Sequence, residues 1–256
     1  MKATLTVLGS GTSMGVPTIG CTCPVCTSPD PHDRRTRPSI LIRWGEHAAV
    51  VDTTPDFRQQ ALREGIRRLD AVLYTHSHAD HVLGLDDLRP LTFWREGKIL
   101  LYAHPPVVRR LQHIFDYIFH GTYQYGGKAE VQLQEINGSV ELYGARFEPV
   151  AVMHGDDEIH GYRFGTAAYV TDFSDIPETS LERLRGLDIL FLDALRRRPH
   201  PTHSTLENSV RLVELLQPRR AFFTHISHDL GHEETNRSLP EHIRLAHDGL
   251  KLEFEL

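Results

Sequence analysis

The residues best suited to chemistry lie in one short segment, His76-Ser77-His78-Ala79-Asp80-His81. Imidazoles and carboxylates are the ligand types that divalent transition-metal ions bind most often in proteins. The segment directly follows the apolar run 71–75, which is typical of a buried strand. Because a strand end and the turn after it direct successive side chains to neighbouring places, this loop is expected to serve two adjacent metal ions.

Further potential ligands follow other apolar runs. His154, Asp172 and His225 each stand directly after a predicted strand. Each of them alone is equally compatible with a capping or loop residue. Together with the first segment they supply five histidines and two aspartates, enough for two metal ions with a bridging carboxylate and a bridging water.

All three cysteines lie in the segment Cys21-Thr22-Cys23-Pro24-Val25-Cys26. Three thiols cannot all pair with one another, so a closed zinc site with three cysteines and one histidine is favoured over disulfides. The expected fourth ligand is His228, three residues after His225. A redox pair and three unligated thiols are the alternatives.

The elements that must position these residues fall into two similar series. The first has strands at 4–8, 39–43 and 48–51, a helix that Thr53, Thr54 and Pro55 start and that runs to residue 63, and a strand at 70–75. The second follows a helix at 106–119 and has strands at 131–135, 141–152, 161–164, 167–171, 188–192 and 219–224, with a helix at 205–216. Two β-rich halves, each followed by βα units, predict two sheets packed face to face with helices outside.

Composition agrees with one folded domain. The chain has 256 residues, of which 40% are hydrophobic and 24% charged. A formal net charge of −6 argues against a protein that holds long nucleic acid by phosphate neutralisation. No run of about 18 apolar residues occurs, and the first residues alternate as in a strand. We therefore expect a cytoplasmic protein with no membrane partner.

The His76–His81 segment resembles the HxHxDH loop of the metallo-β-lactamase superfamily. This resemblance implies a four-layer αββα sandwich over residues 1–256, with a small zinc-binding loop at about 20–28. It further implies that His76, His78 and His154 hold one ion and that Asp80, His81 and His225 hold the other. Asp172 would bridge both ions, and Asp52 would orient one of the ligating histidines.

A narrower resemblance rests on three motifs: the glycine-rich opening 8–17, the CxCxxC segment and the terminal Thr-His-Ile-Ser-His at 224–228. They are similar to those of PhnP-like phosphoribosyl cyclic phosphodiesterases. The resemblance implies a metal-dependent hydrolase of a cyclic ribose phosphate or similar small phosphodiester. It implies two manganese or zinc ions at the active site, one structural zinc, and His203, Asp80 and Asp172 as catalytic residues. Because homodimers are common among such proteins, the resemblance also implies a possible homodimer.

Other functions stay open at this stage. A tRNA 3′-processing nuclease, a PqqB-like protein and a non-catalytic metal-binding or sensing protein share parts of these motifs, and the same metal core serves lactam, thioester and lactone hydrolysis. The basic run Arg196, Arg197 and Arg198 precedes His200 and His203; it is either a solvated face or a phosphate contact. The aromatic residues between 94 and 125 are expected mainly in core packing, with a substrate wall or dimer contact as alternatives.

Overall fold

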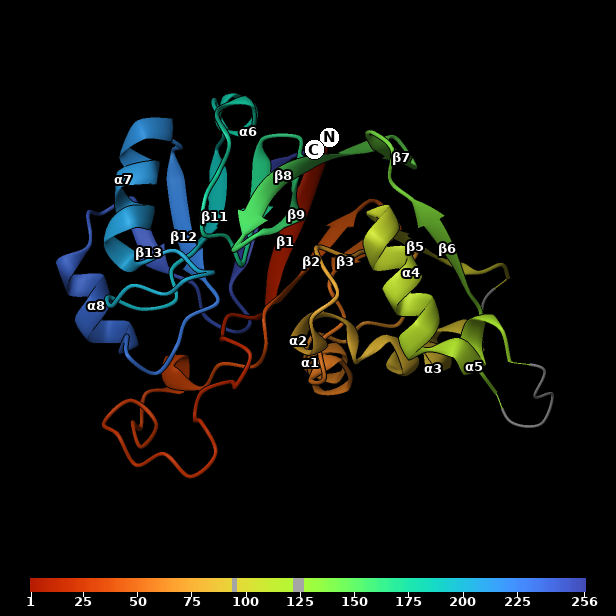
Figure 1. The fold of residues 1–256 in the computed structure, drawn as a ribbon, viewed down its shortest axis with the longest axis horizontal. Helices are drawn as coiled ribbons and strands as arrows, with labels where there is room; N and C mark the ends of the chain where they lie inside the picture. The colour runs from red at the N-terminus through yellow and green to blue at the C-terminus, as the bar shows by residue number, and fades with distance from the viewer. Residues whose placement is uncertain (94–95, 122–126) are drawn as a thin grey trace.

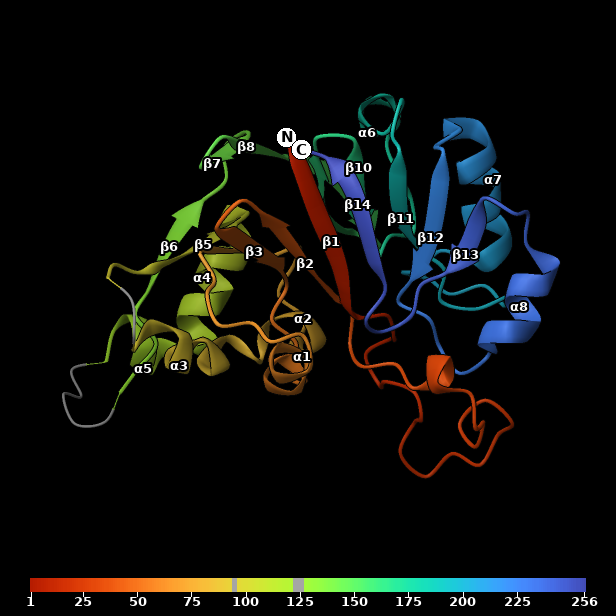
Figure 2. The same ribbon diagram turned by 180° about the vertical axis from the view of Figure 1, so that it is seen from behind.

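The computed structural model describes residues 1–93, 96–121 and 127–256. Over these residues, two mixed seven-stranded sheets pack face to face, with helices covering their outer faces (Figure 1). Figure 2 shows the same arrangement from behind, with the two ends of the chain side by side. The amino group of Met1 donates a hydrogen bond to the carbonyl of Leu256 at 2.6 Å. This architecture confirms the predicted αββα sandwich.

The first sheet has the order β14-β1-β2-β3-β4-β5-β6. Its pairs are antiparallel from β14 to β3 and parallel from β3 to β6, because helical segments connect the later strands. The strands are β1 (Lys2–Gly9), β2 (Ser39–Trp44), β3 (His47–Val51), β4 (Ala71–Leu73), β5 (Ile99–Ala103), β6 (Val131–Glu135) and β14 (Lys251–Glu255). The helices on its side are α1 (Phe57–Arg63), α2 (Ala79–Val82), η2 (Leu85–Leu88), α3 (Arg89–Thr92), α4 (Pro105–Ile114) and α5 (Asp116–Phe119).

The second sheet has the order β13-β12-β11-β10-β9-β8-β7 and repeats the change from antiparallel to parallel pairing. Its strands are β7 (Val140–Leu142), β8 (Ala145–His154), β9 (Asp157–Phe164), β10 (Ala167–Val170), β11 (Ile189–Asp193), β12 (Arg220–Thr224) and β13 (Ile243–Leu245). Its helices are α6 (Glu178–Arg183), α7 (Leu206–Leu216) and α8 (His232–Ser238), and a short helix η1 (Pro31–Asp33) precedes β2.

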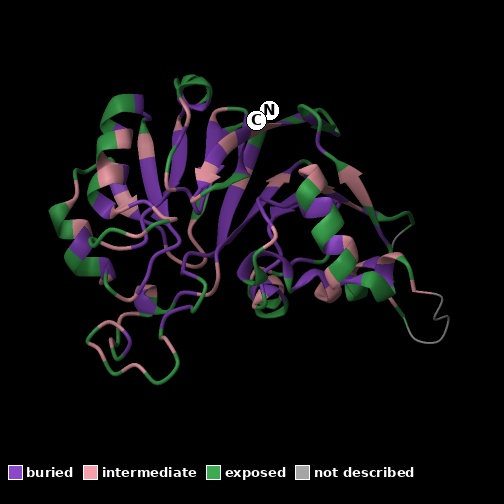
Figure 3. Cartoon of the chain, in the orientation of Figure 1, coloured by how far each residue is buried: buried purple, intermediate pink, exposed green. Residues whose placement is uncertain are grey.

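Side-chain alternation along the strands sorts the apolar residues into three core layers. Ile40 and Ile42 face the space between the sheets, whereas Leu41 faces the helices α1 and α4. A third cluster, which includes Leu190 and Val213, lies between the second sheet and helices α6 and α7. The central strands, such as β3, β4 and β11, are buried on both faces, whereas the edge strands β7 and β14 and the helices are buried on one (Figure 3). The sheets are therefore rigid platforms for the loops at their ends.

Several predicted elements differ in detail. The single strand predicted at 141–152 is a hairpin of β7 and β8, because Tyr143 and Gly144 turn the chain at φ of 48° and 81°. The helix predicted at 106–119 divides at Phe115 into α4 and α5. Helix α1 begins at Phe57, after the expected start at Thr53 to Pro55. Trp94, Tyr123 and Tyr125 of the aromatic stretch lie outside the described residues.

No helix in the described parts of the chain has the length and apolar character needed to cross a membrane. This agrees with the absence of long apolar runs in the sequence.

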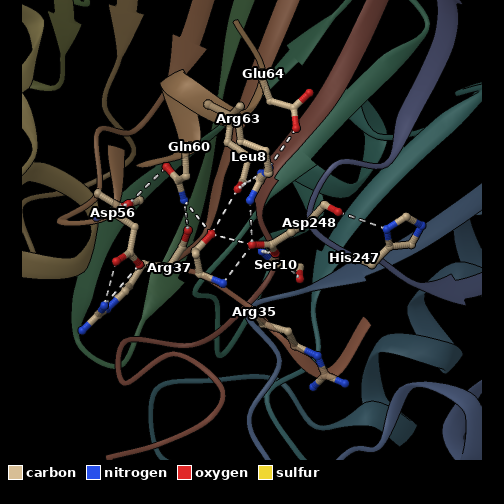
Figure 4. A network of polar contacts seen from close by, with 12 residues as sticks. Leu8, Ser10, Arg35, Arg37, Asp56, Gln60, Arg63, Glu64, His247 and Asp248 are labelled. Atoms are coloured by element: carbon tan, nitrogen blue, oxygen red, sulfur yellow. Dashed lines mark hydrogen bonds and ion pairs between the residues drawn. The ribbon is translucent and has the colours of Figure 1, made fainter. Parts of the chain in front are cut away.

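A buried carboxylate, that of Asp248, connects the start of the first sheet to the loops beside it (Figure 4). Its Oδ1 accepts hydrogen bonds from the backbone N–H and the hydroxyl of Ser10, both at 2.9 Å. Its Oδ2 accepts from the N–H of Thr36 at 2.9 Å and from its hydroxyl at 2.6 Å, and Arg63 Nη1 lies 3.3 Å away. The carboxylate thus fixes the glycine-rich loop against helix α1.

Asp248→Asn is expected to destabilise the fold, because an amide nitrogen would face donors where an oxygen now accepts. The free energy of unfolding should fall by about 2 kcal/mol, measured by urea denaturation. Glu253→Gln removes the same charge from an exposed position on β14 and is expected to change it by less than about 0.5 kcal/mol. Equal effects of the two substitutions would contradict the assigned role of Asp248.

Candidate metal centre

The candidate ligands meet at one edge of the two sheets, where the strands end. Asp52 follows β3, the segment 76–81 follows β4, and Asp172 follows β10. His154 is the last residue of β8, and His225 follows β12. Because these strands run in the same direction within their sheets, their carboxyl ends meet at a common edge. The arrangement brings all the predicted active-site ligands together.

The first group consists of His76, His78 and His154, whose ligand atoms lie within 4.8 Å of one another. His76 Nε2 lies 3.0 Å from His78 Nδ1. His154 Nδ1 lies 2.9 Å from the carbonyl oxygen of Thr202. A carbonyl can only accept, so Nδ1 carries the proton and Nε2 is left as the metal-binding atom.

The second group consists of Asp80, His81, Asp172 and His225, again with ligand atoms within 4.8 Å. Asp172 Oδ2 lies 3.4 Å from His81 Nε2 and 3.1 Å from His225 Nε2. The same oxygen lies 4.0 Å from His76 Nε2 of the first group. Asp172 therefore stands between the two groups, where a bridging carboxylate would have to be.

The charges of these groups fit a cation at their centre. Burial would lower the pKa of His225, but Asp172 and Asp80 raise it to about 9. Burial would raise the pKa of Asp172, but His225 and His81 hold it well below its usual range. His81 Nε2 and both ring nitrogens of His225 are buried without a hydrogen-bond partner in the described chain. These buried carboxylates and imidazole nitrogens need positive charge between them. Protons on the histidines supply it in the absence of metal, and divalent ions can take their place.

Backbone strain is concentrated at the same residues. Asp52, Asp172 and His225 have φ values of 65°, 56° and 56°, in the left-handed region that side chains other than glycine rarely adopt. Each follows or nearly follows a strand end. Strain of this kind is retained when the surrounding structure fixes it, and it is common at functional sites.

Asp52 positions His81. Its Oδ2 lies 2.7 Å from His81 Nδ1, and its two oxygens accept from the N–H and the hydroxyl of Thr75, both at 2.8 Å. Burial raises the pKa of Asp52, although His81 opposes the change. The contact leaves His81 Nε2 facing Asp80 and Asp172. Asp52 does not cap helix α1, which begins at Phe57 with Asp56 as its N-cap residue.

His203 lies against the ligand cluster. Its ring stacks on that of His225 at 4.6 Å and meets that of His154 edge-on at 4.9 Å. Its Nδ1 lies 2.8 Å from Oδ2 of the fully buried Asp193. Burial lowers the pKa of His203 to about 4 and raises the pKa of Asp193 well above its usual range, so the pair can share one proton. Asp193 was not singled out from the sequence, although it follows an apolar run as the other candidates do.

The three cysteines and His228 form a separate group. His228 Nδ1 lies 3.2 Å from the sulfur of Cys21 and 3.5 Å from those of Cys23 and Cys26. A tetrahedral zinc ion would place nitrogen and sulfur ligands about 3.6 Å apart, so the spacing fits. Hydrogen bonding from the Cys26 N–H lowers the pKa of the Cys23 thiol to about 7, which favours the metal-binding thiolate.

A buried arginine joins this group to the segment that carries His225. The Arg35 guanidinium pairs with Asp33 at 2.8 Å and donates to the carbonyls of Ser227 and Leu230 at 3.0 and 2.7 Å. These carbonyls flank His228. Arg35 therefore fixes residues 33–35, which follow the cysteine loop in the chain, against the segment that carries His228.

Comparison with known proteins agrees with this geometry. A family model described as "Beta-lactamase superfamily domain" matches residues 47–226. The octanoyltransferase of Porphyromonas gingivalis is 41% identical over 250 residues, which cover 96% of this chain and 50% of that protein. The chain thus spans half the length of this curated relative.

Two solved structures share the whole fold. A crystal structure of a new diphosphatase from the PhnP family is 62% identical, with a TM-score of 0.95 over 100% of this chain and 98% of that one. Zinc-bound PqqB from Methylobacterium extorquens is 24% identical, with a TM-score of 0.78 over 97% and 99% of the two chains, and shows likeness of fold. From the family match and the 62% identity, the chain belongs to the metallo-β-lactamase superfamily and, within it, to the PhnP family.

Proposed function

We propose that this protein is a metal-dependent hydrolase that cleaves a P–O bond in a small phosphodiester or diphosphate. The observation that carries the proposal is the position of Asp172, whose Oδ2 lies 4.0 Å from His76 Nε2 and 3.1 Å from His225 Nε2. One carboxylate oxygen is thereby shared between two sets of ligands. That arrangement suits a pair of divalent ions and has little use in a single-ion or purely structural site.

The ligands would divide as the geometry groups them. His76, His78 and His154 would hold one ion, Asp80, His81 and His225 the other, and Asp172 both. Imidazole and carboxylate ligands suit manganese and zinc. When bound, such an ion pair polarises phosphoryl oxygens and makes a water acidic enough to act as a nucleophile near neutral pH.

The choice of a phosphorus substrate is supported by the diphosphatase of the PhnP family that is 62% identical to this chain. A cyclic ribose phosphate and a diphosphate share the reacting group, a phosphorus joined to two bridging oxygens. The same centre could therefore serve both. Cleavage of precursor tRNA is a weaker candidate, because the chain carries a net charge of −6 and would repel a long polyanion.

Two residues of the chain, His203 and Asp193, can supply the proton that the departing oxygen needs. Asp193 fixes His203 through Nδ1, so Nε2 is the ring nitrogen left for the substrate. The pair His203 and Asp193 can hold one proton and pass it to a departing oxygen. An anionic substrate beside the ring would favour the protonated imidazole and oppose the effect of burial.

Asp172→Ala is expected to lower kcat/KM for bis(p-nitrophenyl) phosphate by about 10³-fold or more, because it removes the carboxylate between the two ligand groups. Activity is measured in manganese-supplemented buffer, and circular dichroism checks that the fold is kept. Full activity in the folded variant would contradict the proposed function.

His203→Gln is expected to act differently on good and poor leaving groups. With an alkoxide leaving group, as in a 2′,3′-cyclic nucleotide, kcat should fall by about 10²-fold or more, since the departing oxygen needs a proton. With p-nitrophenolate the loss should be less than about tenfold. His113→Gln, at an exposed position on α4, serves as the control. Equal losses on both substrates would exclude proton donation by His203.

We also propose that Cys21, Cys23, Cys26 and His228 hold a structural zinc ion. Their spacing fits a closed tetrahedral site that offers no open position for substrate. Zinc there would join the cysteine loop to the segment that follows His225. It would thereby hold that active-site ligand in position.

Cys23→Ser is expected to reduce bound zinc by about one ion per chain and to lower the thermal unfolding midpoint, because a closed zinc site contributes folding free energy. Elemental analysis and calorimetry measure the two effects. Thr22→Ser, at the exposed neighbouring position, should change neither. Unchanged zinc content and stability in the cysteine variant would show that the three thiols carry no metal.

A further inference from the structure

A further set of potential metal ligands lies outside the active centre and outside the cysteine group. It consists of His104, Glu158 and His160, whose ligand atoms lie within 4.8 Å of one another. His104 follows β5 in the first sheet and directly precedes α4, whereas Glu158 and His160 belong to β9 in the second sheet. The set therefore brings together side chains of both sheets that the proposed reaction does not use.

The position of β9 explains why two of these side chains face the first sheet. Side chains two residues apart along a strand point to the same face, so Glu158 and His160 share the face of Tyr162. Tyr162 lies in the core between the sheets, and its hydroxyl donates to the carbonyl of Tyr74 at 2.7 Å. The N–H of His160 donates to the carbonyl of Thr75 at 3.1 Å. Glu158 is exposed and His160 is buried, so the set lies at the rim of the space between the sheets.

His160 has a buried ring nitrogen without a partner. The residue is only 7% exposed, and its Nδ1 is buried with no hydrogen bond in the described part of the chain. The side chains of His104 and Glu158 likewise make no hydrogen bond or ion pair with another described residue. A buried polar atom that is left unpaired is unfavourable unless a water or an ion binds to it. The unpaired nitrogen therefore points to a ligand at this place.

The two imidazoles are close together and are suited to a metal ion. Their ring centroids lie 4.6 Å apart, with an angle of 39° between the ring planes. Burial and the neighbouring His104 lower the pKa of His160 to about 4, so the His160 ring is neutral near pH 7. A neutral imidazole offers its lone pair to a metal without first losing a proton. Two imidazoles and a carboxylate suit zinc, whereas calcium and magnesium prefer oxygen ligands alone.

The surroundings of the set favour a cation and allow the ligands to close around it. Asp156 and Asp157 precede Glu158 at the turn between β8 and β9, and all three carboxylates are exposed. Ligands of one tetrahedral zinc ion stand about 3.4 Å apart, so the side chains would have to approach one another slightly. The half-buried His104 and the exposed Glu158 can make this movement.

We propose that His104, Glu158 and His160 form an additional metal site, which binds zinc or a similar transition-metal ion and links the two sheets. Three protein ligands leave one of four tetrahedral positions to water, unlike the closed set of three cysteines and a histidine. The ion at this site therefore exchanges more readily, and its occupancy follows the concentration of free zinc. The inference does not depend on which reaction the active centre catalyses.

An ion at this site would act on the edge that carries the active centre. Thr75, whose carbonyl accepts from His160, donates from its own N–H to Asp52 at 2.8 Å and directly precedes His76. An ion that links β9 to the end of β5 would restrain the chain on both sides of this edge. Zinc is therefore expected to stabilise the folded protein through this site, because the unfolded chain has no preformed ligand set.

The test counts zinc bound to the full chain after equilibrium dialysis against a fixed concentration of free zinc. Elemental analysis compares the unsubstituted protein with His104→Gln, Glu158→Gln and the control His113→Gln, which removes an exposed histidine from α4. His104→Gln and Glu158→Gln should each bind about one ion fewer per chain, whereas the control should bind as many as the unsubstituted protein. The result is a difference between variants, so the number of ions at other sites does not enter it.

Two further measurements locate the missing ion. The rise of the thermal unfolding midpoint on addition of zinc should be smaller in His104→Gln and Glu158→Gln than in His113→Gln. The loss of about one ion should also appear when His104→Gln is added to Asp172→Ala, because the additional site shares no ligand with the active centre. This second comparison holds even if the proposed function fails.

Equal zinc content in the unsubstituted protein, His104→Gln and Glu158→Gln would overturn the inference and leave the two histidines as a neutral pair in contact. An equal loss in His113→Gln would overturn it as well, because the ion would then belong to exposed histidines in general. Circular dichroism checks that each variant is folded. Glu158 is exposed, so its substitution keeps the test valid even if His104→Gln disturbs the start of α4.

Discussion

The attraction between the Asp172 carboxylate and the imidazoles around it is the interaction on which the active centre depends. Asp172 lies among His76, His81 and His225, all of them buried. Burying a carboxylate is costly unless opposite charge compensates it, and burying several imidazoles close together is costly for the same reason. A centre of this kind is stable only when positive charge is present, which is why metal binding and the order of this edge should be coupled.

The apolar cores of the two sheets offset the energetic cost of this centre. Asp52, Asp172 and His225 are held at positive φ, and each such residue costs about 1–3 kcal/mol. Extensive buried apolar layers lie between the sheets and beneath the helices on either side. Burial of that surface stabilises the fold far more than the strain destabilises it. These three strained residues stand at or next to strand ends, where the core beside them cannot rearrange to relieve the strain.

The sequence predicted the parts of this molecule that depend on local pattern. Apolar runs that end in His or Asp marked His154, Asp172 and His225 as candidates, and the resemblance to the metallo-β-lactamase superfamily predicted that they form one site. Arg35 and Asp248 could not be found in this way, since their partners lie up to 238 residues away and no periodicity marks them. Asp193 also stands at the end of an apolar run, but it belongs to none of the motifs that carried the family resemblance. The hairpin at Tyr143 and Gly144 was missed because an apolar pattern continues through the turn.

The segment between β11 and α7 positions two histidines of the centre and part of the pocket beside them. The carbonyl of Thr202 sets the orientation of His154, and Asp193 at the end of β11 sets that of His203. The same segment places Arg196, His200 and His203 in the wall of one pocket. Strand ends supply the ligands, which must be held rigidly, whereas a loop can change its side chains without disturbing the core. The ligands at the strand ends and the side chains of this loop can therefore be substituted independently of one another.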